Sequence, residues 1–156
     1  FNSLSSLCIS LLAERDPMPE FYQKTVKFLD RIETHENWEY LYLDWELNLL
    51  TCIGYGLDLD KCVASGSTEN LSYISPKSGK AVSREYGLKY DKKLLPFPII
   101  LKEKKTYNGF NKSDLLSGLR ITGFFIKKWL KYALNNDQTM LIRQRLIDTL
   151  SNEENT

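Results

Sequence analysis

The chain has 156 residues, of which 42% are apolar and 26% are charged. These fractions are typical of a globular domain and exclude a collagen-like, low-complexity or wholly disordered chain. The formal net charge is only +1, but residues 1–60 hold 4 Lys or Arg against 11 Asp or Glu, while residues 61–156 hold 17 against 9. The positive charge of the second part suggests contact with a polyanion, although a solvated surface without a specific partner is an equal alternative.

Residues 1–57 are expected to be helical. Apolar residues recur at helical spacing before Pro17, and the same period continues through residues 21–32. The pattern is strongest in a third stretch, where one apolar stripe is formed by Trp38, Leu41, Trp45, Leu49 and Cys52. Such a stripe is far more often core than a cofactor site, and Glu46 is expected to lie off it. Gly54 is expected to end this helix because glycine tolerates the left-handed conformation of a C-cap.

Residues 58–87 differ in composition and predict a β-ribbon insertion. They are rich in serine and glycine, and short β-forming runs at Leu71–Ile74 and Ala81–Ser83 flank a turn at Pro76-Lys77-Ser78-Gly79. This arrangement predicts a small β-hairpin between helices. The predicted fold class is therefore mainly α, a helical bundle with a small β-hairpin insertion.

Residues 88–150 are expected to form a basic, irregular segment followed by two helices. The first helix starts near Ser113, a plausible N-cap with an acidic residue in the first turn, and runs to about residue 134. The second spans about residues 137–150. The polar tail 151–156 is expected to fray. We expect the whole chain to be a single domain.

The first of these two helices carries a basic stripe. Arg120, Phe124, Lys127 and Lys131 fall at i, i+4, i+7 and i+11, which places them on one face. The opposite face is expected to be core and consists of Leu115, Leu119, Thr122, Ile126, Trp129 and Ala133. The stripe suits a phosphate backbone with a base stacked on the ring, or an acidic peptide whose carboxylate an arginine binds. The alternative is that Phe124 is buried and the lysines are merely solvated.

A second group of cations lies on and after the ribbon. Lys77 and Lys80 flank the predicted turn and should be exposed, and Arg84, Lys92 and Lys93 follow. These side chains are candidates for phosphate contacts that do not depend on base sequence. Ordinary surface lysines are an equal alternative. A third group has a weaker case because Glu103 lies within it: Lys102, Lys104 and Lys105.

No catalytic constellation is visible in the sequence. The one histidine, His35, lies in a charged run without a nearby nucleophile. The run Ser78-Gly79-Lys80-Ala81 is similar to part of a phosphate-binding loop but lacks its first glycine and its Ser or Thr. We therefore expect a protein that is not an enzyme and has no cofactor. The three cysteines and the absence of an apolar run long enough to span a bilayer suggest a cytoplasmic protein.

Several segments, in order along the chain, resemble the RecO family of bacterial DNA repair and recombination mediators. They are Trp45–Leu50, Gly54–Cys62 and Gly118–Phe125, while Gly66–Glu85 resembles the α-proteobacterial branch of that family. The resemblance covers essentially the whole chain. It implies that the chain is a C-terminal part, and that the family's N-terminal OB-fold domain would precede Phe1.

The resemblance also directs attention to a zinc site. Many members of the family hold zinc with two Cys-x-x-Cys pairs in the ribbon, and the corresponding positions here are Cys62, Ser65, Ser83 and Tyr86. The spacing is kept but three of the ligands are not, and structural zinc normally takes four Cys or His ligands. We therefore expect no metal. Apolar packing would then hold the ribbon through Leu71, Tyr73, Ile74, Val82 and Tyr86, with Cys62 as a small, buried, unreactive residue.

The resemblance implies a function without catalysis. RecO-like proteins bind single- and double-stranded DNA, anneal complementary strands, and act with RecR to help RecA replace the single-strand-binding protein on DNA. They also bind the acidic C-terminal tail of that protein. The chain is thus expected to be a DNA-binding mediator associated with the nucleoid. The alternative is a protein-interaction module that docks this tail and binds little DNA itself.

Overall fold

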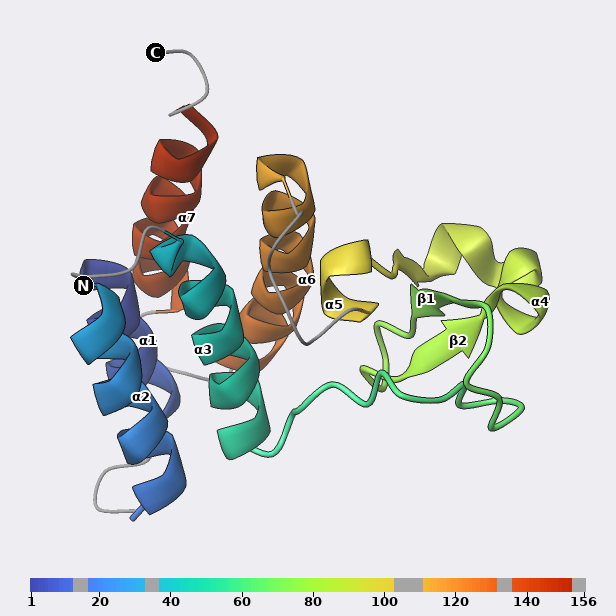
Figure 1. Ribbon diagram of the computed structural model, residues 1–156, viewed down its shortest axis with the longest axis horizontal. Helices are drawn as coiled ribbons and strands as arrows, with labels where there is room; N and C mark the ends of the chain where they lie inside the picture. Colours follow the sequence, from blue (N-terminus) through green and yellow to red (C-terminus); the bar gives the residue numbers. More distant parts are fainter. Residues whose placement is uncertain (13–16, 33–36, 103–110, 132–135, 153–156) are drawn as a thin grey trace.

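The computed structural model describes residues 1–12, 17–32, 37–102, 111–131 and 136–152 (Figure 1). Long helices gather at one end of the molecule, a small sheet lies at the other, and a short helix stands between them. The predicted fold class, mainly α with a small β insertion, is confirmed. None of the described helices is both long enough and apolar enough to cross a bilayer.

The bundle is built from the long helices. Their bounds are α1 Asn2–Leu11, α2 Pro19–Ile32, α3 Trp38–Cys52, α6 Lys112–Leu130 and α7 Asn136–Asn152. Helix α3 packs against α2 and α6, and α7 packs against α1 and α6. The chain leaves α3 through Gly54, whose φ of +85° is the left-handed conformation expected of the glycine that ends this helix.

The core lies around α3. Trp45 and Leu49 of the predicted stripe are buried, and the Trp45 ring stacks with those of Phe28 and Tyr42. The stripe is only part of the buried surface, because both α2 and α6 pack on α3 and Arg143 of α7 contacts Glu46. Glu46 was expected to lie off the apolar stripe, and its side chain is nevertheless fully buried.

The sheet has three antiparallel strands in the order β2-β1-β3. Strands β1 (Leu71–Ile74) and β2 (Ala81–Ser83) have the bounds expected from the sequence. Strand β3 (Leu95–Pro96) was not foreseen and pairs with β1 at the sheet edge, where a proline is tolerated because one side of the strand needs no partner. The segment around it, expected to be irregular, also forms η1 (Leu88–Lys93) and the short helix α5 (Ile99–Lys102).

Helix α6 begins earlier than expected. Its N-cap is Asn111 rather than Ser113: the Asn111 side chain accepts from the Asp114 N–H at 3.0 Å, and the Asp114 carboxylate accepts from the Asn111 N–H at 3.1 Å. This reciprocal capping box satisfies two otherwise unpaired N–H groups. Predictions were also made for residues that lie outside the described part of the chain, namely His35, Lys104, Lys105, Ala133 and residues 153–156.

Candidate nucleic-acid interface

The predicted basic stripe occupies an exposed face of α6. Arg120, Lys127 and Lys131 are exposed, and Phe124 keeps 39% of its surface accessible. The alternative in which Phe124 is buried is therefore wrong. Its ring meets the buried Phe125 ring edge-on, with 5.2 Å between centroids, so one side of Phe124 is held while the rest faces solvent.

The opposite face of α6 is core, as expected. The buried residues there include Leu115, Leu119, Thr122 and Ile126. Trp129 is half-buried. The helix is therefore held firmly by its apolar face, and the stripe is displayed on a rigid element.

Lys128 joins the ribbon to α6. Its Nζ donates hydrogen bonds to the main-chain oxygens of Pro76 at 3.0 Å and Lys77 at 2.9 Å, and it lies 5.0 Å from the centroid of the Trp129 ring. Nothing in the sequence marks Lys128, because no local pattern distinguishes a lysine that binds a distant carbonyl from one that is solvated. The contact brings the ribbon turn onto the face of α6 that carries the stripe.

The turn can approach α6 closely because of Gly79. Its φ is +70°, and a Cβ built there would stand 3.1 Å from Leu57 and 3.7 Å from the Phe125 ring. Glycine accepts both the conformation and the crowding. The main chain of the exposed Lys77 thus lies against Lys128 of α6. We call Lys77, Lys127, Lys128 and Lys131 with Phe124 the basic junction.

The structure divides the predicted ribbon cations into two places. Strand β2 runs from the turn at α6 to α4 (Arg84–Gly87) at the far end of the molecule, so Arg84 lies away from the junction (Figure 1). Lys92 and Lys93 lie in η1, which follows α4 directly, and all three are exposed. Lys80 pairs with Asp58 at 3.7 Å, which partly neutralises its charge.

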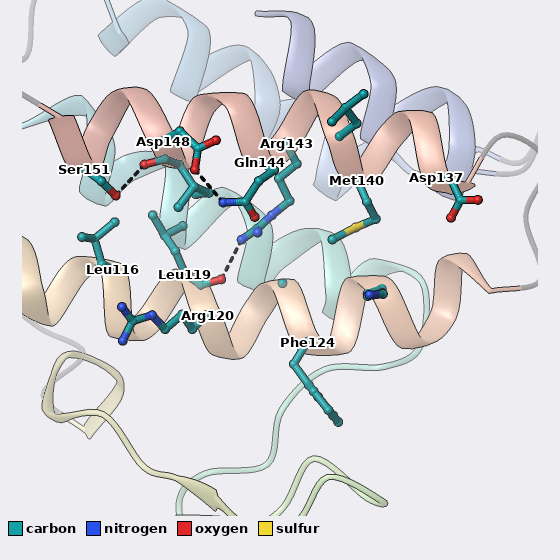
Figure 2. A pocket seen from close by; sticks show the side chains of 14 residues that line it. Leu116, Leu119, Arg120, Phe124, Asp137, Met140, Arg143, Gln144, Asp148 and Ser151 are labelled. Atoms are coloured by element: carbon teal, nitrogen blue, oxygen red, sulfur yellow. Dashed lines mark hydrogen bonds between the residues drawn. The ribbon is translucent and has the colours of Figure 1, made fainter.

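A groove of about 640 Å³ runs between α6 and α7 beside the stripe. Figure 2 shows Arg120 and Leu116 on one wall and Met140, Gln144 and Asp148 on the other. Both charge signs are present, because Arg120 and Lys127 line the groove together with Asp137 and Asp148. The groove therefore offers an apolar floor with an arginine at its edge, but side chains of both charge signs line it.

Arg143 lines the same groove, yet its charge is committed to the core. Its Nε donates to Glu46 Oε1 at 2.7 Å, and its Nη2 donates to Glu46 Oε2 at 2.8 Å and to the Leu119 carbonyl at 2.7 Å. The Thr122 hydroxyl donates to Glu46 Oε2 at 2.5 Å. Burial alone would lower the pKa of Arg143, but the neighbouring Glu46 carboxylate raises it, so the guanidinium stays charged.

The zinc positions form a hydrogen-bond cluster instead of a metal site. The Ser83 N–H donates to Cys62 Sγ at 3.3 Å, and the Ser65 and Ser83 side chains also hydrogen-bond to this sulfur. The Cys62 sulfur, which would have to coordinate a metal, therefore accepts hydrogen bonds instead. No group of three Cys, His, Asp or Glu side chains comes together within the described ranges. These residues do not fit a zinc ion.

Two expectations about the ribbon need correction. Cys62 is buried as expected, but it is a hydrogen-bond acceptor and not an inert apolar residue. Burial would raise the pKa of its thiol, yet the hydrogen bonds from Ser65 and Ser83 outweigh burial and lower the pKa from 9.0 to about 6. Tyr86 was expected to pack in the ribbon and is 47% exposed. The helical turn that follows β2 carries its ring outward, away from the strands that bury Ile74 and Val82.

The Cys62 cluster predicts a dependence of stability on pH. A thiol whose pKa is lower in the folded than in the unfolded chain stabilises the fold fully above pH 9, and this contribution is lost as the pH falls from 9 through about 6. Wild type should therefore gain stability relative to Cys62→Ala as the pH rises through this window. Urea unfolding of both proteins across the window measures it. Parallel pH profiles would show that no thiolate forms in the folded chain.

The structure thus places a positively charged junction on a helical bundle that carries a ribbon insertion. A scan against family models matches residues 2–136 to the C-terminal domain of recombination protein O. Curated relatives called DNA repair protein RecO include those of Ruegeria sp. (strain TM1040), 37% identical over 96% of this chain and 61% of that protein, and Wolbachia pipientis wMel, 40% identical over 85% and 57%. That of Jannaschia sp. (strain CCS1) is 39% identical over 96% of this chain and 61% of that protein.

The chain belongs to the RecO family, and the resemblance seen in its sequence is confirmed. It spans about three fifths of the length of these relatives. No solved structure matches the chain significantly.

Proposed function

We propose that this chain acts in DNA repair as the C-terminal part of a recombination mediator, and that its basic junction binds the phosphate backbone of DNA. The observation that carries the proposal is the pair of hydrogen bonds from Lys128 to the ribbon turn. These bonds hold the main chain of Lys77 against α6, and we therefore expect cations that are 50 or more residues apart in the sequence to act on one ligand.

The chemistry of the junction suits a polyanion that is bound without base sequence being read. Lysine ammonium groups contact phosphates as point charges and release condensed counterions, so binding weakens as salt rises. The exposed Phe124 adds a surface on which an unpaired base can stack. Strand annealing and the loading of RecA together with RecR are proposed for the whole protein, and membership of the family supports them.

Removing two junction cations should weaken DNA binding and its salt dependence. The double variant Lys77→Ala, Lys127→Ala deletes one charge from the ribbon and one from α6. For a single strand, log K against log salt should become shallower by about 1.4, since each phosphate contact contributes about 0.7. Fluorescence anisotropy of a labelled oligonucleotide over a salt series measures this slope.

The matched control removes two exposed cations from α2, by Lys27→Ala with Arg31→Ala. It changes the net charge equally but not the junction. An equal loss in both double variants would mean that only net charge matters. An unchanged slope in the junction variant would show that DNA does not bind at the junction.

The groove between α6 and α7 favours a second candidate function. Its apolar floor and the exposed Arg120 suit the acidic C-terminal tail of single-strand-binding protein, with the arginine on the terminal carboxylate. Asp137 and Asp148 line the same groove and oppose an acidic ligand, which ranks this candidate below DNA. Arg120→Ala should abolish binding of a labelled tail peptide, whereas Lys77→Ala, which lies outside the groove, should leave it intact.

A further inference from the structure

The segment from Arg84 to Lys93 displays nearly all of its side chains to solvent. It comprises α4 and η1, and of its ten residues Gly87 is the one that is buried. A Cβ at Gly87 would lie 2.2 Å from Cδ2 of Tyr73, so the backbone itself rests on the sheet. The Arg84 N–H also donates to the Asn70 carbonyl at 2.9 Å. The segment is therefore held by its backbone, and its side chains remain available for a ligand.

Two tyrosine rings stand on this segment. Tyr86 is 47% exposed and Tyr90 is 58% exposed, and they are four residues apart in a helical stretch with a kink at Tyr90. No hydrogen bond joins either hydroxyl to another residue that the structure describes. Aromatic rings so exposed gain free energy when a flat partner covers them.

Four cations share the segment with the two rings. Arg84, Lys89, Lys92 and Lys93 are all exposed, and none forms an ion pair with another described residue. The segment carries two acidic residues as well, Glu85 and Asp91. The Asp91 carboxylate accepts the main-chain N–H of Lys92 at 2.7 Å. The segment is therefore positive overall, which complements a phosphate backbone.

A hollow of about 560 Å³ adjoins Tyr86. Its lining includes Tyr86 and Leu88 and the polar side chains of Ser67 and Asn70, together with the carboxylates of Glu69 and Glu85. Hydroxyl and amide groups can hydrogen-bond to the edge of a base whose face lies on the ring.

We infer that α4 and η1 form a stacking site for unpaired nucleotides, in which Tyr86 and Tyr90 stack on bases while Arg84, Lys89 and Lys93 contact phosphates. This inference rests on the proposed function, and it adds a preference for single strands. Bases of a duplex are stacked on one another and present their faces only at its ends, whereas every unpaired base offers a face to an aromatic side chain. The site is separate from the junction, at the far end of the ribbon (Figure 1).

The test compares affinities of the 156-residue chain for a labelled oligothymidylate and for a duplex of equal length. The double variant Tyr86→Ala, Tyr90→Ala should bind the single strand at least about 25-fold more weakly, because each of the two stacked bases contributes roughly fivefold or more. Duplex affinity and the single-strand salt slope should stay at the wild-type level. Tyr86→Phe with Tyr90→Phe keeps the rings and should bind as wild type does, as should Tyr22→Ala, which removes an exposed tyrosine from α2.

An unchanged single-strand affinity, or an equal loss on both ligands, would overturn the stacking site. If the junction variant Lys77→Ala, Lys127→Ala still loses affinity in that case, the proposed function stands without it. If wild type binds neither ligand at low salt, both proposals fall.

Ultraviolet cross-linking of the wild-type chain to the oligothymidylate tests the site without relying on an alanine variant that could fail to fold. Mass spectrometry should find the cross-link on the peptide that carries Tyr86 or Tyr90. Cross-links confined to other peptides would overturn the site.

Discussion

Replacing Arg143 with Met is expected to destabilise the protein by about 3–5 kcal/mol, which is the cost of leaving a buried charge without its partner. Glu46 is fully buried, and Arg143 supplies two hydrogen bonds to its carboxylate. The variant also leaves the Leu119 carbonyl without the guanidinium. Urea unfolding followed by circular dichroism measures the loss.

Two further variants separate charge from packing. Arg145→Met removes an exposed arginine two residues along α7 and should leave the free energy of unfolding nearly unchanged. Glu46→Leu combined with Arg143→Met should recover much of the loss, because a buried pair replaced by apolar residues is often neutral. If Arg143→Met costs no more than Arg145→Met, the Glu46 carboxylate is not buried as the structure has it.

Replacing Trp45 with Ala is expected to cost about 3–5 kcal/mol, the range for removing a buried aromatic side chain. The ring is 2% exposed and stacks on Phe28 and Tyr42 at centroid distances of 6.2 and 5.9 Å. Its Nε1 donates to the Thr25 hydroxyl at 3.0 Å, which ties α3 to α2. Thermal and urea unfolding report the change.

Trp45→Phe is the matched variant, since it keeps an aromatic ring and loses the hydrogen bond to Thr25. It should cost clearly less than the alanine change. Tyr22→Ala on the exposed face of α2 should cost little. Equal losses for Trp45→Ala and Tyr22→Ala would contradict the burial of Trp45.

The basic junction shows which features of a site can be predicted from local sequence and which depend on packing. The stripe on α6 follows from the 3.6-residue period, since Arg120, Phe124 and Lys127 must share a face of any helix they form. Whether that face is free depends on what packs on α6, and the structure leaves it exposed. Lys128 lies one residue further and would have been assigned to solvent, yet it holds the ribbon turn.

In the ribbon, local sequence predicts two strands but not the third strand or the exposure of Tyr86. Its two strands follow from β-forming runs around a turn, and both were predicted with the observed bounds. The third strand has two residues and contains Pro96, so only its pairing with β1 makes it a strand. Tyr86 was assigned to the ribbon core, but the turn into α4 places its ring outside.

Helix period and strand alternation are local properties, and the order of the RecO-like segments can be followed along the chain. For that reason sequence alone is enough to assign the helical class, the hairpin and the family. Glu46, Arg143 and Thr122 come from three separate helices. The helical period alone places Thr122 on the core face, but nothing near Glu46 or Arg143 in the chain marks either of them as buried. Their pairing, like the meeting of Lys77 with α6, exists only once the helices pack, because a contact between distant residues depends on how whole elements are oriented. The bundle thus decides which charges are enclosed in the core and which remain free for a ligand.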